Sequence, residues 1–208
     1  MRIKIYKEPE LSKPYMICGL PGMGHVAKLS ADYLIESLHA ELFKEIYSSS
    51  FPPYILSKNG IAEPTKNEFY FWRGKAKDLI IFTGNAQPEG VQAGSLRAHY
   101  EIANEVLDTA ENFNTCKIFT VAAYITQRQA PKPRVWGVMT DKKLVSEIKK
   151  YGVILMSDGG ITGMNGLLLG IAALRNVPGL CLLGETPTPY HADPRAAHAV
   201  LEVLIKML

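Results

Sequence analysis

The chain has 208 residues, 47% of them hydrophobic and 21% charged, with a formal net charge of +3 at pH 7. This length suits one α/β domain with a substantial core, and the composition excludes a disordered or low-complexity chain. Lysines and arginines are scattered, which argues against a nucleic-acid partner. No apolar run reaches the ~18 residues that a membrane-spanning helix needs. We therefore expect one domain over residues 1–208 that binds neither nucleic acid nor a membrane.

The three cysteines, Cys18, Cys116 and Cys181, each lie in an apolar, strand-like run. Their odd number and their spacing fit neither a disulfide framework nor a metal site, so we expect reduced thiols packed as small hydrophobic side chains. Residues 1–6 alternate in polarity instead of forming the apolar segment of a signal peptide. These features predict a cytoplasmic protein without a bound metal.

The first part of the chain predicts an edge strand followed by a strand–turn–helix unit. Residues 2–6 alternate as an edge strand does, and the continuous apolar run 15–18 predicts a buried strand. That strand leads into the glycine-rich turn 19–24, after which apolar residues recur at helical spacing from Val26 to Leu38. Such a unit points backbone N–H groups at whatever lies above the turn.

The middle of the chain predicts strands and one long helix. Residues 40–50 predict an extended strand, which Phe51-Pro-Pro53 ends because proline disrupts helices and central strands. The aromatic-rich run 68–73 and the apolar run 78–83 predict two strands joined by a hairpin turn. In the helix that follows, the spacing places four residues on one face: Leu96, Tyr100, Ala103 and Leu107.

The last third predicts alternating strands and helices. Asp141 is expected to cap a short helix, and Asp193, followed by proline, to cap the final helix through residue 208. The expected strands are 116–123, 134–139, 153–156 and 180–183, and residues 165–174 form an apolar helix buried on most sides. This alternation predicts a three-layer αβα sandwich around a mainly parallel sheet, to which the hairpin-like middle adds antiparallel strands.

Four glycine-bearing segments follow predicted strands, at residues 19–24, 84–90, 159–166 and 184–189. In open α/β sheets ligands bind at the carboxyl ends of the strands, so these segments are the candidate binding loops.

The first segment formally matches the dinucleotide fingerprint GxGxxG/A in Gly22-Met-Gly24-His-Val-Ala27. The acidic partner of that fingerprint would be Glu45, which lies inside a predicted strand instead of at its tip. Pro21 also stiffens the turn, and His25 stands where a Walker A loop has lysine. We therefore expect no cofactor.

Few side chains suggest chemistry. His25 opens the first helix, where an imidazole could act as a base, although a surface or packed histidine is the commoner case. Asp158 and Glu185 end successive predicted strands and would form a carboxylate pair if those strands were neighbours; otherwise they cap helices or bind loops. No Ser, Cys or Lys nucleophile has an adjacent base, so no catalytic residue is predicted. The candidate ligand- or partner-binding residues are Gly22, Gly24, His25, Gln87, Asp158, Asn165 and Glu185.

Taken together, five blocks resemble the proteasome assembly chaperone 2 family, especially its archaeal members. They are residues 19–35, Phe51-Pro-Pro53, residues 78–88, residues 162–170 and Gly184-Glu-Thr-Pro187, in the family's order. The resemblance implies an α/β fold similar to the phosphorylase/hydrolase-like class and homo-oligomerisation. It also implies ATP-independent binding to proteasome subunits or assembly intermediates, and no catalytic site.

Two features depart from the family's pattern. Ala27 stands where the family is expected to have glycine, so the turn-to-helix packing must accept a methyl group. Members that dock on the proteasome α-ring end in a hydrophobic residue, tyrosine and any residue, whereas this sequence ends Lys206-Met-Leu208 within a predicted helix. We expect docking either to depend on a tail that this sequence lacks or to use another surface.

Two hypotheses follow. The first is a non-enzymatic, homo-oligomeric assembly chaperone or adaptor for proteasome-related complexes. The second is a small-molecule-binding protein or enzyme, with a nucleoside or phosphate ligand at the strand-end glycine loops. The first needs an exposed apolar contact surface, and the second a concave pocket with convergent polar groups.

Overall fold

The computed structural model describes residues 1–88, 93–127 and 130–208. Within these ranges, strands join into one nine-stranded sheet of order β1-β3-β6-β7-β2-β8-β11-β9-β10, and β4 and β5 form a separate hairpin. The strands are β1 Arg2–Ile5, β2 Tyr15–Cys18, β3 Glu41–Tyr47, β4 Ile55–Lys58, β5 Ile61–Pro64, β6 Asn67–Trp72, β7 Leu79–Gly84, β8 Lys117–Ile125, β9 Val135–Met139, β10 Ile154–Leu155 and β11 Gly179–Thr186. The helices are η1 Met23–His25, α1 Val26–Leu38, α2 Ala93–Asn112, η2 Lys142–Leu144, α3 Val145–Lys149, α4 Gly163–Leu174 and α5 Pro194–Met207.

The centre of the sheet is parallel and its flanks are mixed. Strands β7, β2, β8 and β11 run parallel, with Cys18 aligned to Phe82 on one side and Thr120 on the other. Strands β6, β3 and β1 continue one flank by antiparallel pairing. On the other flank β9 pairs antiparallel with β11, and β10 pairs parallel with β9.

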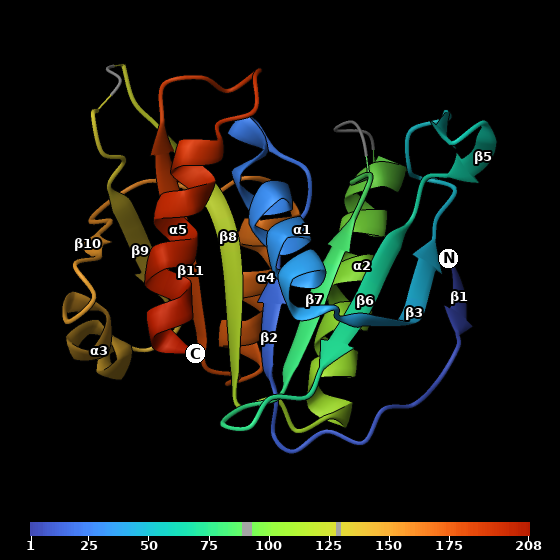
Figure 1. Ribbon diagram of the computed structural model, residues 1–208, viewed down its shortest axis with the longest axis horizontal. Helices are drawn as coiled ribbons and strands as arrows, with labels where there is room; N and C mark the ends of the chain where they lie inside the picture. The colour runs from blue at the N-terminus through green and yellow to red at the C-terminus, as the bar shows by residue number, and fades with distance from the viewer. Residues whose placement is uncertain (89–92, 128–129) are drawn as a thin grey trace.

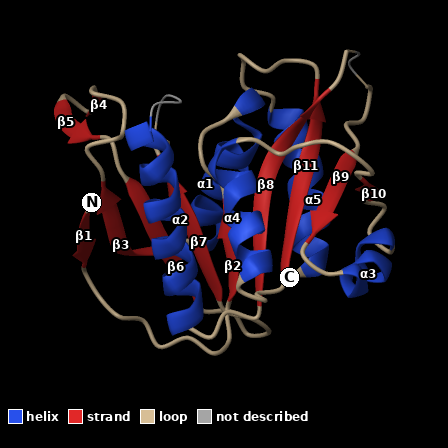
Figure 2. Cartoon of the chain, turned by 180° about the vertical axis from the view of Figure 1, so that it is seen from behind, coloured by secondary structure: helices blue, strands red, loops and turns tan. Residues whose placement is uncertain are grey.

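Helices cover both faces of this sheet. Helices α1 and α5 lie side by side on the near face in Figure 1, and α2 and α4 lie together on the opposite face, seen in Figure 2. The predicted three-layer αβα sandwich is therefore confirmed.

The hydrophobic core is divided by the sheet into two main clusters. On β2, Ile17 belongs to the cluster under α1 and α5, whereas Met16 and Cys18 belong to the cluster under α2 and α4. All three side chains are fully buried. A strand buried on both faces has no polar side to show, which explains the continuous apolar run of residues 15–18.

The hairpin of β4 and β5 was not predicted. Its turn is Asn59-Gly60, with φ angles of 52° and 78°. Asn-Gly with both φ angles positive is the favoured two-residue hairpin turn, so this dipeptide was the available signal. The hairpin projects beyond the ends of β3 and β6 and lies at the upper right of Figure 1.

The predicted face of the long helix is only half correct. Ala103 and Leu107 are fully buried, but Leu96 is 51% and Tyr100 is 55% exposed. The buried stripe of α2 is centred on Ile102 and Val106, so Leu96 and Tyr100 fall at its edge.

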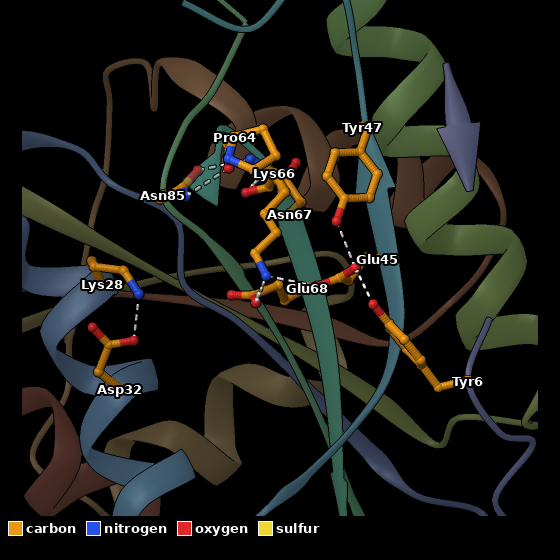
Figure 3. A network of polar contacts seen from close by, with 10 residues as sticks. All are labelled: Tyr6, Lys28, Asp32, Glu45, Tyr47, Pro64, Lys66, Asn67, Glu68 and Asn85. Atoms are coloured by element: carbon orange, nitrogen blue, oxygen red, sulfur yellow. Dashed lines mark hydrogen bonds and ion pairs between the residues drawn. The ribbon is translucent and has the colours of Figure 1, made fainter. Parts of the chain in front are cut away.

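The flank formed by β1, β3 and β6 is held by a buried carboxylate, Glu45, shown in Figure 3. Its Oε2 accepts hydrogen bonds from the hydroxyl groups of Tyr6 at 2.5 Å and Tyr47 at 2.7 Å. Its Oε1 accepts from Lys66 Nζ at 2.6 Å, and the same Nζ lies 2.8 Å from Glu68 Oε1. The cluster links the segment that follows β1, strand β3 and the start of β6, which are neighbours in the sheet.

The cysteines are free, as expected, but not equally buried. Cys18 and Cys181 lie in the core, and burial raises the pKa of the Cys181 thiol to about 12. Cys116 is only half-buried, and its thiol donates to the carbonyl of Lys13 at 3.1 Å. Over the described ranges, no helix has both the length and the apolar character to cross a bilayer.

Candidate functional site

Three of the four glycine segments meet at one cavity of about 480 Å³, at the carboxyl ends of β2 and β8. We call it the strand-end cavity. Two of the predicted candidates with side chains, Gln87 and Asn165, lie in its wall with Gly22. It is lined by Gly22, Met23, Ala27, Gln87, Ala122, Ala123, Tyr124, Ile125, Met156, Gly160, Ile161, Thr162, Gly163, Asn165 and Leu183. Residues 89 and 90 of the second glycine segment lie outside the described residues.

Gln87 joins two walls of the strand-end cavity. Its Oε1 accepts from the backbone N–H of Met164 at 2.9 Å, and its Nε2 donates to the carbonyl of Pro21. The side chain thereby caps the first turn of α4 and ties it to the turn that follows β2. Because its amide oxygen and its amide nitrogen both have partners within the chain, Gln87 serves to hold the wall of the cavity in place.

Asn165 lies in the first turn of α4 and is only 6% exposed. Its Oδ1 is buried without a hydrogen-bond partner. The turn before it depends on Gly163, which has a φ of 77°, a conformation that other residues seldom adopt.

The fourth glycine segment does not line the cavity but covers the turn after β2. The N–H of Gly24 donates to the carbonyl of Pro189 at 3.1 Å, and the N–H of Asp193 donates to the carbonyl of Gly24 at 2.8 Å. A Cβ at Gly24 would lie 3.2 Å from Thr186 Cγ2 and 3.3 Å from the Thr188 carbonyl oxygen. Gly24 therefore serves close packing within the chain, and its backbone groups are not open to a phosphate.

The position of Glu45 also departs from the dinucleotide pattern. Glu45 lies on β3, which is separated from β2 by β6 and β7. An acidic residue that reads a ribose must end the strand next to the glycine turn. Residues 22–27 thus match the dinucleotide fingerprint in sequence, but the acidic residue does not lie where a dinucleotide site needs it.

Asp193 holds the covering segment to helix α5. Its Oδ1 accepts from the N–H groups of Arg195 and Ala196, and its Oδ2 accepts from Thr186 Oγ1 at 2.8 Å.

We expect Asp193→Ala to lower the free energy of unfolding by about 2 kcal/mol, because a helix cap and a buried hydroxyl both lose their partner. Asp141→Ala, which removes an exposed cap of a single turn, should cost about 0.5 kcal/mol. Urea unfolding measures the free energy of both variants. Equal losses would contradict the conclusion that Asp193 stabilises the fold more than an exposed helix cap does.

His25 is exposed and immediately precedes α1, with a φ of 49°. It is absent from the residues that line the strand-end cavity. The expected placement at the helix start is confirmed, and a role as a base stays a prediction.

The condition for a carboxylate pair of Asp158 and Glu185 is not met, and Glu185 instead binds a loop backbone by accepting from the N–H of Arg134 at 3.1 Å. Strand β9 inserts between β10 and β11, so the strands before these residues are not neighbours. Both oxygens of Glu185 instead bind Arg134, at 2.9 Å from Nε and 2.7 Å from Nη2. These hydrogen bonds hold the pKa of Glu185 below its ordinary value. Asp158 is exposed and borders a separate cavity of about 350 Å³ beside α4.

Two exposed apolar surfaces were not predicted. The first is the β4–β5 hairpin, where Ile55 is 60% and Ile61 is 70% exposed. The second is a groove between α1 and α5, lined in part by Leu29, Tyr33 and Ile205. The Asn59-Gly60 turn was the available signal for the first surface, whereas the groove depends on the packing of helices far apart in the sequence.

Residues 16–208 match the model of the PAC2 family. The chain belongs to the PAC2 family. The match begins in β2 and includes the turns that line the strand-end cavity.

Two solved structures from Pyrococcus furiosus resemble this chain throughout. One is PbaB, described as an archaeal proteasome activator, with 37% identity, a TM-score of 0.91 and coverage of 100% of this chain and 88% of PbaB. The other is PbaA, described as an archaeal homolog of proteasome-assembly chaperone, with 31% identity, a TM-score of 0.80 and coverage of 99% and 81%. The uncharacterized protein MJ1210 of Methanocaldococcus jannaschii is 36% identical over 199 residues, 95% of this chain and 74% of that protein.

Proposed function

We propose that the chain is a non-enzymatic, ATP-independent and homo-oligomeric assembly chaperone or adaptor that binds proteasome subunits or assembly intermediates in the cytoplasm. Membership of the PAC2 family supports the class of function, as does the similarity to PbaB, an archaeal proteasome activator, and to PbaA, an archaeal homolog of proteasome-assembly chaperone. The three free cysteines agree with a reducing compartment.

The observation that carries the proposal is the exposed apolar hairpin of β4 and β5. Register pairs Leu56 with Glu63 and Lys58 with Ile61, so Leu56 and Ile61 share one face of the hairpin. Leu56 is 38% and Ile61 is 70% exposed. Exposed apolar side chains gathered on a projecting element are typical of a protein-contact surface.

The base of the hairpin is held in place by Asn85, which follows β7 (Figure 3). Asn85 Oδ1 accepts from the N–H of Lys66 at 2.8 Å, and Asn85 Nδ2 donates to the carbonyl of Pro64 at 3.4 Å. A hairpin anchored at its base loses less conformational freedom on binding than a free loop does.

The last residues of α5 are not available as a free tail. Met207 is buried, and Leu208 packs against the core while its N–H donates to the carbonyl of Leu204 at 3.1 Å. The hairpin offers a contact that does not depend on these residues.

Binding to purified proteasome α and β subunits of the source organism tests the proposal. The expected result is a complex that forms equally with and without ATP, on a chain that light scattering after gel filtration shows to be an oligomer. Failure to bind any subunit or assembly intermediate would remove the proposed function, and a monomer would remove its homo-oligomeric part.

The double variant Leu56→Ser/Ile61→Ser is expected to weaken subunit binding at least tenfold, because apolar contacts at the interface are lost. Its free energy of unfolding should stay within about 0.5 kcal/mol of wild type, since both side chains are exposed. Leu96→Ser/Leu174→Ser, which changes exposed leucines on α2 and α4, is the matched control and should bind normally. Equal binding by both double variants would contradict the hairpin as the contact surface.

A further inference from the structure

Strand β1 ends the sheet, and one of its two edges is free. It pairs with β3 on one side and is the outermost strand of its flank in Figures 1 and 2. Within the described residues no strand pairs with its other side. Such an edge presents a row of unpaired N–H and C=O groups, which is a template for a further strand.

The register of β1 shows which of its backbone groups point outward. The N–H of Tyr6 donates to the carbonyl of Phe43 at 2.8 Å, so these two residues form a hydrogen-bonded pair. In an antiparallel ladder such pairs alternate with pairs whose backbone groups point away from the partner strand. Lys4 therefore bonds to β3, whereas Ile3 and Ile5 direct their N–H and C=O groups to the free edge.

The side chains of β1 differ between its two faces. Ile3 lies opposite Ile46, which belongs to the core cluster under α2 and α4, so Ile3 and Ile5 lie on the face that α2 covers further along the sheet. They are 38% and 57% exposed, so this short apolar row is only partly covered. Arg2 and Lys4 lie on the opposite face and are exposed.

The face with Arg2 and Lys4 carries positive charge that no ion pair neutralises among the described residues. Lys4 Nζ lies 4.4 Å from the ring centre of Tyr6. The carboxylate opposite Lys4 in the register, Glu45, already accepts from Lys66 and from two tyrosines. Carboxylates on an added strand would complement these two charges, because opposite charges on neighbouring strands attract.

A second copy of the chain fits this edge poorly. The two antiparallel registers with the most overlap pair Ile3 of one copy with either Ile3 or Ile5 of the other. The first register sets Arg2 opposite Lys4, and the second sets Lys4 opposite Lys4. Like charges directly opposite each other destabilise a strand pair.

We propose that the free edge of β1 binds an extended segment of another protein, as an added strand in which acidic and apolar residues alternate. Hydrogen bonds to the backbone of Ile3 and Ile5 hold this segment. Its apolar side chains then lie beside the two isoleucines, and its carboxylates lie beside Arg2 and Lys4. This edge is separate from the β4–β5 hairpin and binds independently of the proposed subunit contact.

A hexapeptide of alternating glutamate and valine, blocked at both ends, is a suitable probe, and the same peptide with lysine for glutamate is the charge control. In ¹H–¹⁵N spectra, millimolar glutamate peptide should shift the amide signals of Ile3 and Ile5 more than that of Lys4, since only the outward N–H groups gain a partner. The lysine peptide should shift none of them. No response to the glutamate peptide, or equal responses to both peptides, would overturn the proposal.

N-methylation of the peptide tests the backbone pairing without changing the protein. Residues directly opposite each other in a strand pair share a face, so valines lie opposite Ile3 and Ile5 and direct their own N–H groups to β1. Methylating the valine nitrogens should weaken binding at least tenfold. Methylating the glutamate nitrogens, which point away from β1, is the matched control and should leave binding unchanged. Equal affinities of the two methylated peptides would contradict strand addition.

Arg2→Gln/Lys4→Gln should weaken binding of the glutamate peptide about fivefold, because two opposite-charge pairs between neighbouring strands are lost. Lys149→Gln/Lys150→Gln, which removes two exposed cations at the end of α3, has the same net charge and should bind as wild type does. Equal weakening by both double variants would show that net charge alone attracts the peptide. Protection of the Ile3 and Ile5 amides from deuterium exchange without peptide would show that a second copy occupies the edge, against the proposal.

Discussion

Glu45→Gln is expected to lower the free energy of unfolding at pH 7 by about 2 kcal/mol, because three donors lose the buried charge that they share. Those donors are Tyr6, Tyr47 and Lys66, and the side chain of Glu45 is 3% exposed. The loss is smaller than for a fully isolated ion pair, since Lys66 keeps Glu68 as a partner. Urea unfolding followed by circular dichroism measures it.

The pH dependence of this difference follows from the direction of the pKa shifts. Burial acts to raise the pKa of Glu45, but hydrogen bonds from Lys66, Tyr6 and Tyr47 outweigh it and hold the pKa below the ordinary value of 4.5. Such a carboxylate stabilises the fold fully above its unfolded-state pKa, and the contribution is lost as pH falls through the folded-state pKa. The stability gap between wild type and Glu45→Gln should therefore be full at pH 7 and shrink progressively below 4.5.

The matched control is Glu41→Gln, the same change on the same strand. Glu41 also pairs with a lysine, Lys7, but both side chains are largely exposed. Exposed pairs contribute little to stability, so this variant should unfold close to wild type at every pH. A gap for Glu45→Gln that stays constant down to pH 3 would show that the charge of Glu45 contributes nothing.

The parallel centre of the fold could be predicted because its strands carry a strong local signal. Strands such as β2 and β7 are buried on both faces and read as continuous apolar runs between glycine turns. The caps at Asp141 and Asp193 were equally readable, since a capping side chain acts on the next few residues.

The order of the strands could not be read in the same way. The insertion of β9 between β10 and β11 is a long-range pairing that leaves no mark on the sequence of β10 or β11. It is this insertion that separates Asp158 from Glu185 and places Arg134 against Glu185 instead. Because β1 and β11 belong to one sheet, we propose that residues 1–208 unfold as one unit.

The candidate site was predictable in its parts but not in their roles. The glycine segments pointed to the carboxyl edge of the sheet, where the strand-end cavity lies. The contact between Gln87 and Met164 spans 77 positions, so sequence alone could not show that Gln87 braces the wall. The missing partner of Asn165 Oδ1 is a property of packing and is visible only in the structure.

Two glycines of α4, one turn apart, are expected to respond to alanine with opposite signs. At Gly166, a Cβ would lie 2.1 Å from the carbonyl oxygen of Ile161, which belongs to the loop that lines the strand-end cavity. That backbone must move to admit a methyl group, so Gly166→Ala should lower the free energy of unfolding by about 2 kcal/mol. At Gly170, a Cβ would meet no atom within 4 Å. Gly170→Ala should raise the free energy by about 0.5–1 kcal/mol through better helix propensity.

The pair forms its own control, because both substitutions add the same methyl group to the same helix. Intrinsic helix propensity favours alanine at both positions, so the difference between the variants, about 3 kcal/mol, isolates the contact with Ile161. Urea unfolding of the two variants in parallel measures this difference. Equal stabilisation by both variants would show that the loop before α4 does not pack on Gly166. The close contact between Ile161 and Gly166 would then not be what positions this part of the cavity wall.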